Sequence, residues 1–216
     1  MLIDLLIHSP IIFVPVFAAL VTAITVHEFA HAFAADKLGD PTPRLMGRLT
    51  LNPLKHMDPF GTLMMLILNF GWGRPVVFDP YNLKNPRRDA AIISFAGPLS
   101  NLLLASVLSI ILKIMANAGI GGLFAVVAPL FIKFNVTLAI FNLIPVHPLD
   151  GGKILVGLLP PHEARTVDRI MSQYGMIILI FILIVPLFGG TSFVNAVLTP
   201  IVNFLMKIYL PGRQYI

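Results

Sequence analysis

The run PIIFVPVFAALVTAITVHEFAHAFAA, residues 10–35, is apolar except for the pentapeptide HEFAH at residues 27–31. As an α-helix rising about 1.5 Å per residue, it is long enough to cross the roughly 30 Å hydrocarbon core of a bilayer. From Ser9 to Ala35 the only ionisable side chains are His27, Glu28 and His31. We therefore expect a first membrane-spanning helix over residues 10–35, with these three polar groups in its second half.

The spacing of the two histidines indicates a metal site. His27 and His31 are four residues apart, so on a helix their imidazoles project from nearly the same face. Two such imidazoles can bind one Zn²⁺, and Glu28 beside them is placed to take a proton from a water that the metal activates. Each ionisable group near the middle of a membrane helix costs about 2.5–3.5 kcal/mol on insertion scales, and a bound metal compensates for this cost. The alternatives are a chance match or a polar contact between helices.

The composition independently indicates a membrane protein. The chain is 57% hydrophobic and only 12% charged, with a mean hydropathy of +0.88, whereas a soluble domain carries roughly 25% charged residues. The absence of cysteine excludes disulfides, thiolate zinc sites and cysteine nucleophiles. A net charge of +5 would suggest nucleic acid for a soluble protein. Here the basic residues lie in loops between apolar runs, so we expect a lipid bilayer and no nucleic acid as a partner.

Further apolar runs predict an all-α polytopic membrane protein with about five transmembrane helices. After the first span, we expect a second over residues 90–115 and a third over residues 123–144. Two more apolar runs follow at residues 174–188 and 193–209, of which the first is marginal for a full crossing. In the second span, the small residues Ser94, Gly97 and Ser100 predict close packing against another helix.

The segment between the first two spans differs from the rest of the chain. Residues 44–51 alternate loosely and residues 76–78 are β-branched and aromatic, so both could form short strands. Residues 62–70 are apolar but too few to cross as a helix. We therefore expect a small re-entrant or β-strand region on the cytoplasmic side. An exposed edge at Arg74–Phe78 could pair with an unwound substrate by strand addition, or it could only anchor a loop.

The length suggests one domain, because no low-complexity linker divides the chain. We expect a single membrane-embedded domain over residues 1–216. Its core would cover about residues 10–155, and residues 173–210 would add C-terminal helices.

A catalytic zinc site uses three protein ligands and leaves a fourth position open. Without cysteine, the third ligand must be His, Asp or Glu, and Asp150 is the favoured candidate because it follows the third span directly. To reach a metal held by His27 and His31 at the end of the first span, Asp150 must lie at the same depth. The first and third spans must then run parallel, which requires an odd number of crossings between them. The second span by itself provides this odd number. Residues 62–70 must therefore dip in and return, or lie along the surface.

The distribution of basic residues agrees with this topology. Residues 36–89 carry eight Lys or Arg and residues 149–172 carry three, whereas the expected outer segments 1–9, 116–122 and 189–192 carry none. Short basic loops stay in the cytoplasm. The sequence thus predicts a multi-pass protein of the cell membrane, with its N-terminus outside and its metal site toward the cytoplasm.

The sequence resembles the site-2 protease family of intramembrane zinc metalloproteases in four segments that occur in the family's order. These are HEFAH at residues 27–31, GRLTLNPLKHMDPFG at 47–61, FAGPLSN at 95–101, and NLIP at 142–145 followed by LDG at 149–151. The resemblance implies one zinc ion per chain, held by His27, His31 and Asp150. It also implies that Glu28 is the general base and that Asn142 stabilises the oxyanion.

The resemblance further implies an intramembrane zinc endopeptidase that hydrolyses peptide bonds within or near transmembrane segments of membrane-protein substrates. Two other classes remain open: a membrane metal transporter, because intramembrane His and Asp line ion routes, and a catalytically silent protein that binds membrane helices. Asn142 could instead make a hydrogen bond between helices. His147 departs from the family pattern and could be a competing ligand, a partner of a ligand or a surface histidine.

Overall fold

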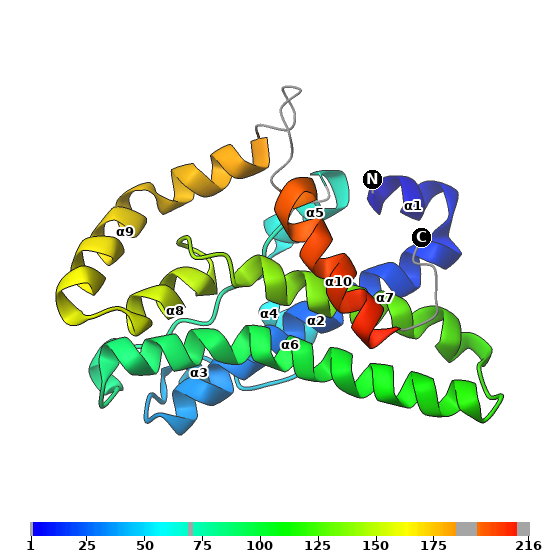
Figure 1. Cartoon of the computed structure of the whole chain (residues 1–216), viewed down its shortest axis with the longest axis horizontal. Coiled ribbons are helices and arrows are strands. Elements are labelled where there is room, and N and C mark those ends of the chain that lie inside the picture. Colours follow the sequence, from blue (N-terminus) through cyan, green and yellow to red (C-terminus); the bar gives the residue numbers. More distant parts are fainter. Residues whose placement is uncertain (1, 69–70, 185–193, 211–216) are drawn as a thin grey trace.

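The computed structural model describes residues 2–68, 71–184 and 194–210, and the described residues are helical or irregular throughout (Figure 1). The helical elements in chain order are α1 (Leu2–His8), α2 (Pro10–Lys37), α3 (Thr42–Leu45), α4 (Pro53–His56), α5 (Pro59–Leu68), η1 (Pro80–Asn82), α6 (Pro86–Asn117), α7 (Gly122–Asn142), α8 (Asp150–Leu158), α9 (Pro161–Ile184), η3 (Val194–Leu198) and α10 (Thr199–Tyr209).

Three of these helices, α2, α6 and α7, are long and apolar enough to cross a membrane. They coincide with the first three expected spans to within four residues at each end. The expectation of five spans is not confirmed, because the described residues contain only these three candidates. α9 begins with a charged half, and α10 belongs to a shorter apolar helix. Residues 185–193, which include the end of the first C-terminal run and the start of the second, lie outside the described residues.

Helix α6 organises the bundle because it packs against both α2 and α7, which also contact each other (Figure 1). The hydrophobic residues that α2 buries are all alanines, and small residues let helix backbones approach closely in a bilayer. The second half of α6 contributes to a core cluster with α7 and α10. This cluster includes Ala105, Ile132, Val136 and Val202. The bundle thereby holds the second half of α2 next to the first half of α6, where the three polar groups lie.

The predicted strands are wrong. Of residues 44–51, the first two belong to helix α3 and residues 46–51 are irregular. Helix α3 begins at Thr42, whose N–H and hydroxyl donate hydrogen bonds to the Asp40 carboxylate. Residues 76–78 are not part of a strand in the described chain. Among the described residues, the one β-type pairing is an isolated antiparallel bridge between Met57 and Gly73.

That bridge closes a hairpin built from α5 and the residues after it. Gly61 and Gly71 pack so closely that a Cβ on Gly71 would lie 2.1 Å from the Gly61 carbonyl oxygen. The chain therefore leaves and returns at the same place, and α5 contacts α1. Because the segment returns, it leaves α6 as the single long helix between α2 and α7, as the position of Asp150 requires.

Candidate metal centre

Three side chains from two helices converge at the centre of the bundle. His27 and His31 project from α2, and Asp150 is the first residue of α8. Asp150 Oδ2 lies 3.0 Å from His27 Nε2 and 3.3 Å from His31 Nε2. One ligand atom from each of the three residues lies within 4.8 Å of the others. Both histidines are buried and the Asp150 side chain is 15% exposed, so the group is shielded from bulk water.

Hydrogen bonds on the other ring nitrogens fix how the imidazoles point. His31 Nδ1 donates to the Ile93 carbonyl at 2.7 Å. His27 Nδ1 lies 2.7 Å from Asn101 Oδ1, and the Asn101 amide nitrogen donates to the Ala23 carbonyl and to Asn135 Oδ1. Because the Asn101 amide nitrogen faces two acceptors, its oxygen must face His27, so His27 Nδ1 carries the proton. Both Nε2 atoms of the neutral rings then present lone pairs to Asp150.

This donor set fits a zinc ion. Two imidazole lone pairs and a carboxylate oxygen repel one another unless a cation lies between them. Ligand atoms of a tetrahedral zinc, each about 2.0–2.2 Å from the metal, are about 3.3–3.6 Å from one another. The observed separations of 3.0 and 3.3 Å are close to that spacing.

The turn between α7 and α8 brings Asp150 to the histidines. α7 ends at Asn142, and α8 begins at Asp150, where the helix N-terminus favours a carboxylate. The two glycines that follow belong to α8 and pack on the turn. A Cβ on Gly151 would lie 2.3 Å from the Ile144 carbonyl oxygen, and one on Gly152 would lie 2.9 Å from the His147 nitrogen. Only glycines let the first turn of α8 pack this closely on the turn.

Gly97 on α6 gives the imidazoles their space. A Cβ at this position would lie 2.5 Å from His31 Nε2 and 2.7 Å from His27 Cε1. The close helix packing predicted for the small residues of α6 therefore occurs directly against the metal-binding face of α2. Any larger residue at position 97 would displace both rings.

Glu28 and Asn142 line a small chamber of about 130 Å³ together with the three converging side chains. Glu28 Oε2 accepts a hydrogen bond of 2.9 Å from the Val76 N–H, which fixes the carboxylate beside the histidines. One amide N–H of Asn142 donates to the Leu138 carbonyl of its own helix. This hydrogen bond is not the contact between helices that was considered for Asn142.

Lys153 completes the chamber lining, with its ammonium 4.7 Å from the centre of the Phe78 ring. Burial lowers the pKa of Lys153, and the carboxylates of Asp150 and Glu28 only partly offset this effect.

The remaining histidine prediction concerns His147, which does not join the ligand group. Its Nε2 lies 3.4 Å from Asp168 Oδ1 on α9, and its side chain is 16% exposed, so it is neither a ligand nor fully on the surface.

Residues 74–78, for which strand addition was considered, already use two of their N–H groups. Arg74 donates to the His56 carbonyl and Val76 to Glu28, and Pro75 has no N–H. Pairing with a substrate strand therefore depends on the N–H groups of Val77, whose side chain is exposed, and Phe78.

Three contacts of the site were not anticipated from the sequence: those of Asn101, the Ile93 carbonyl and the Val76 N–H. Asn101 carried a detectable signal, because it is a polar residue four positions after Gly97 in an apolar helix and so lies on the same face. The other two are backbone groups, whose contacts cannot be predicted from the residue type.

Comparison with known proteins agrees with this geometry. The sequence model of Peptidase family M50 matches residues 15–125 and 113–186. The chain is 39% identical over 191 residues to a Bacillus subtilis protein named "Putative zinc metalloprotease YwhC", covering 85% of this chain and 87% of that protein. It is 33% identical over 184 residues to "Putative zinc metalloprotease Rip2" of Mycolicibacterium smegmatis, covering 81% and 68% respectively. No solved structure matches the chain.

The family match covers most of the chain, and the relatives match it over most of their own length. The structure brings together two histidines and an aspartate that could hold a metal ion. The chain belongs to Peptidase family M50, the zinc metalloproteases that the sequence resembles.

Proposed function

We propose that the protein is an intramembrane zinc endopeptidase that hydrolyses peptide bonds within or near transmembrane segments of membrane-protein substrates. The observation that carries this proposal is the convergence of His27, His31 and Asp150 within 4.8 Å, with Glu28 in the same chamber, inside a bundle of apolar helices. A peptide bond in a membrane segment can reach such a centre without leaving the bilayer region.

The proposed roles follow from chemistry and position. His27, His31 and Asp150 hold one zinc ion, which supplies Lewis-acid activation of water and of the peptide carbonyl. Glu28 takes the proton from the attacking water and passes it to the leaving amine, while the Val76 N–H keeps its carboxylate in place. Asn142 has a second amide N–H besides the one donated to Leu138, and this group would donate to the developing oxyanion.

We further propose a single domain over residues 1–216 that is embedded in the cell membrane. The N-terminus lies outside and the metal site lies toward the cytoplasm, because the basic loops flank the same ends of α2 and α7 as the site. The hairpin closed by Met57 and Gly73 dips into the bilayer and returns, and two C-terminal crossings complete the bundle.

Zinc quantitation and cleavage of a model transmembrane peptide, measured on the same purified preparations, test the proposal. We expect about one zinc per wild-type chain, none in Asp150→Ala, and full zinc without turnover in Glu28→Gln. A metal transporter or a silent helix-binding protein would bind zinc but show no cleavage in the wild type. Zinc retained by Asp150→Ala at the wild-type level would contradict the ligand assignment.

A further inference from the structure

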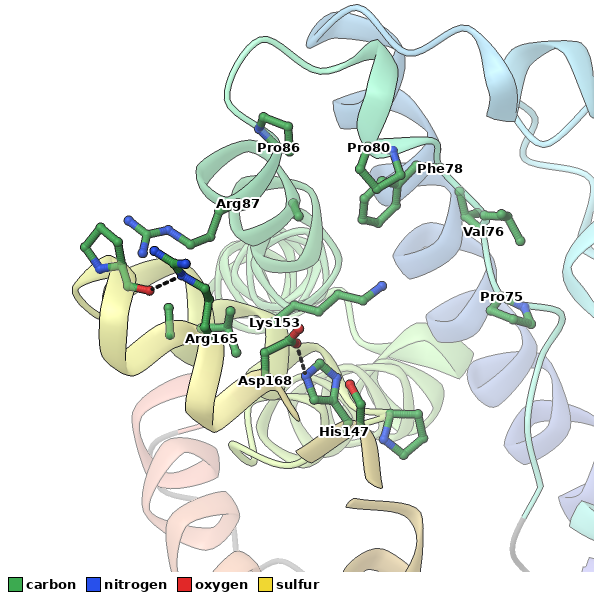
Figure 2. Close-up of a pocket in the computed structure, with 17 residues that line it drawn as sticks. Pro75, Val76, Phe78, Pro80, Pro86, Arg87, His147, Lys153, Arg165 and Asp168 are labelled. Carbon is green, nitrogen blue, oxygen red and sulfur yellow. Dashed lines mark hydrogen bonds and ion pairs between the residues drawn. The ribbon is translucent and has the colours of Figure 1, made fainter. Parts of the chain in front are cut away.

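A groove of about 980 Å³ continues from the metal chamber to the surface between residues 75–80, the start of α6, α8 and α9 (Figure 2). The groove and the chamber share five lining residues: Pro75, Val76, Phe78, Pro148 and Lys153. Its lining is mainly apolar, and its size is at the upper end of ligand sites, about 300–1,000 Å³. A polypeptide that reaches the metal centre can therefore continue along the groove.

The charged side chains of the groove are mostly basic. Arg87 on α6, Lys153 on α8 and Arg165 on α9 line it, against one carboxylate, Asp168, which lies beside His147. Within the described part of the chain, none of these three cations lies within 4.0 Å of a carboxylate. Figure 2 shows Lys153 reaching from α8 into the groove toward Phe78, and the contact of its ammonium with the Phe78 ring confirms this direction.

We propose that the groove binds the cytoplasm-side flank of a membrane-protein substrate as an extended peptide, and that it selects flanks carrying Asp or Glu. This inference rests on the proposed function. The apolar walls accept the peptide's side chains, and the three basic side chains attract anionic groups. Carboxylates of the substrate supply these partners, whereas a flank rich in Lys or Arg is repelled.

Basic residues are expected in any cytoplasmic loop. The effect of arginines that line the groove must therefore be separated from the effect of basic charge elsewhere on the same helices. The chain offers matched controls. Arg88 follows Arg87 on α6 and Arg169 lies one turn after Arg165 on α9, but neither control residue lines the groove. All four arginines are exposed, so their replacement leaves the helix core intact.

The test measures peptide binding to zinc-loaded Glu28→Gln protein in neutral detergent micelles, so it does not depend on turnover. Two fluorescent peptides share one transmembrane segment and differ only in a cytoplasmic flank with three Glu or three Gln. We expect tighter binding of the Glu peptide. Arg87→Gln and Arg165→Gln should each reduce this preference about two- to fivefold, while Arg88→Gln and Arg169→Gln leave it unchanged.

Several results would overturn the proposal. Equal affinity for both peptides, or an equal loss in all four arginine variants, would reduce the effect to general surface charge. If Arg87→Gln and Arg165→Gln lost binding of an anionic phospholipid without any peptide preference, the groove would belong to lipid headgroups. Absence of cleavage by the wild-type protein would refute the proposed function instead, and the binding preference would remain a separate result.

Discussion

Two aspartates, the buried Asp40 and the half-buried Asp150, occupy opposite surroundings in the same molecule. The Asp40 carboxylate accepts four hydrogen bonds, from the Thr42 N–H and hydroxyl, the Asp79 N–H and the Asn82 side-chain amide, at 2.6–3.0 Å. It thereby ties the end of α2 to the loop before α6. The Asp150 carboxylate faces two imidazoles whose protons are already donated elsewhere.

The difference separates a structural carboxylate from a proposed metal ligand. Around Asp40 donors outnumber acceptors, so the charge is satisfied by the protein alone. Around Asp150 acceptors gather without donors, so the arrangement is complete only with a cation. The same residue type therefore supports the fold at one position and the chemistry at the other. Substitutions that change one function but not the other test this distinction.

The largest effect is expected from Gly97→Ala. The added methyl group would lie 2.5 Å from His31 Nε2, so the rings must move and the ligand spacing is lost. A displacement of about 1 Å in a catalytic site costs about 100-fold in rate, so kcat/KM should fall at least that far together with zinc content. Gly121→Ala is the control, because its methyl group would be 3.3 Å from Ala125 and far from the site. Normal zinc content in Gly97→Ala would show that the rings adapt and that the close approach is not required.

A smaller effect on the same centre is expected from Asn101→Leu. Without the amide oxygen, the His27 ring loses the hydrogen bond that fixes its protonation and orientation. Loss of such a partner typically lowers metal affinity about 10- to 100-fold, which competition with a zinc chelator measures. Ser109→Ala removes another buried hydrogen bond of α6 without touching the histidines, and it should bind zinc like the wild type. Equal weakening in both variants would mean that the loss reflects helix packing.

The convergence of His27, His31 and Asp150 could be predicted from the sequence, because the proposed ligands are side chains in regular positions. The spacing of His27 and His31 places them on one helix face, and counting helical crossings brings Asp150 to their level. Asn101 was noted only as the last residue of the motif at residues 95–101 and was given no role, since a single polar residue in an apolar helix has several explanations. The Val76 N–H and the Ile93 carbonyl could not be predicted, because their roles arise from tertiary contacts of the backbone.

The segment between α2 and α6 was predicted less well for a related reason. Loose alternation suggested strands at residues 44–51, but the buried Asp40 carboxylate and the prolines at positions 41 and 43 favour a helical turn there. Tertiary hydrogen bonds thus overrode the local pattern. The long apolar helices were predictable because their length alone requires a bilayer.

The smallest and most specific effect is expected from Asp40→Asn. The amide nitrogen of asparagine would face the Asp79 N–H or the Asn82 amide, so at least one buried donor loses its acceptor. The free energy of unfolding should fall by about 1–3 kcal/mol, measured by denaturation in detergent, while zinc content stays at the wild-type level. Asp36→Asn is the matched control, because Asp36 pairs with the exposed Arg44 and such a pair contributes about 0–1 kcal/mol.

The pH dependence of the free energy of unfolding tests the same prediction in a second way. Burial raises the pKa of the Asp40 carboxyl, but the hydrogen bonds from Thr42, Asn82 and Asp79 outweigh it and hold the pKa below its ordinary value. A carboxyl whose pKa is lower in the folded state stabilises the fold above its unfolded pKa of about 4, and this contribution is lost as the pH falls through the folded pKa. The wild type should therefore lose stability in that acidic range more steeply than Asp40→Asn. Parallel pH profiles for the two proteins would mean that Asp40 is not the charged anchor that distinguishes it from Asp150.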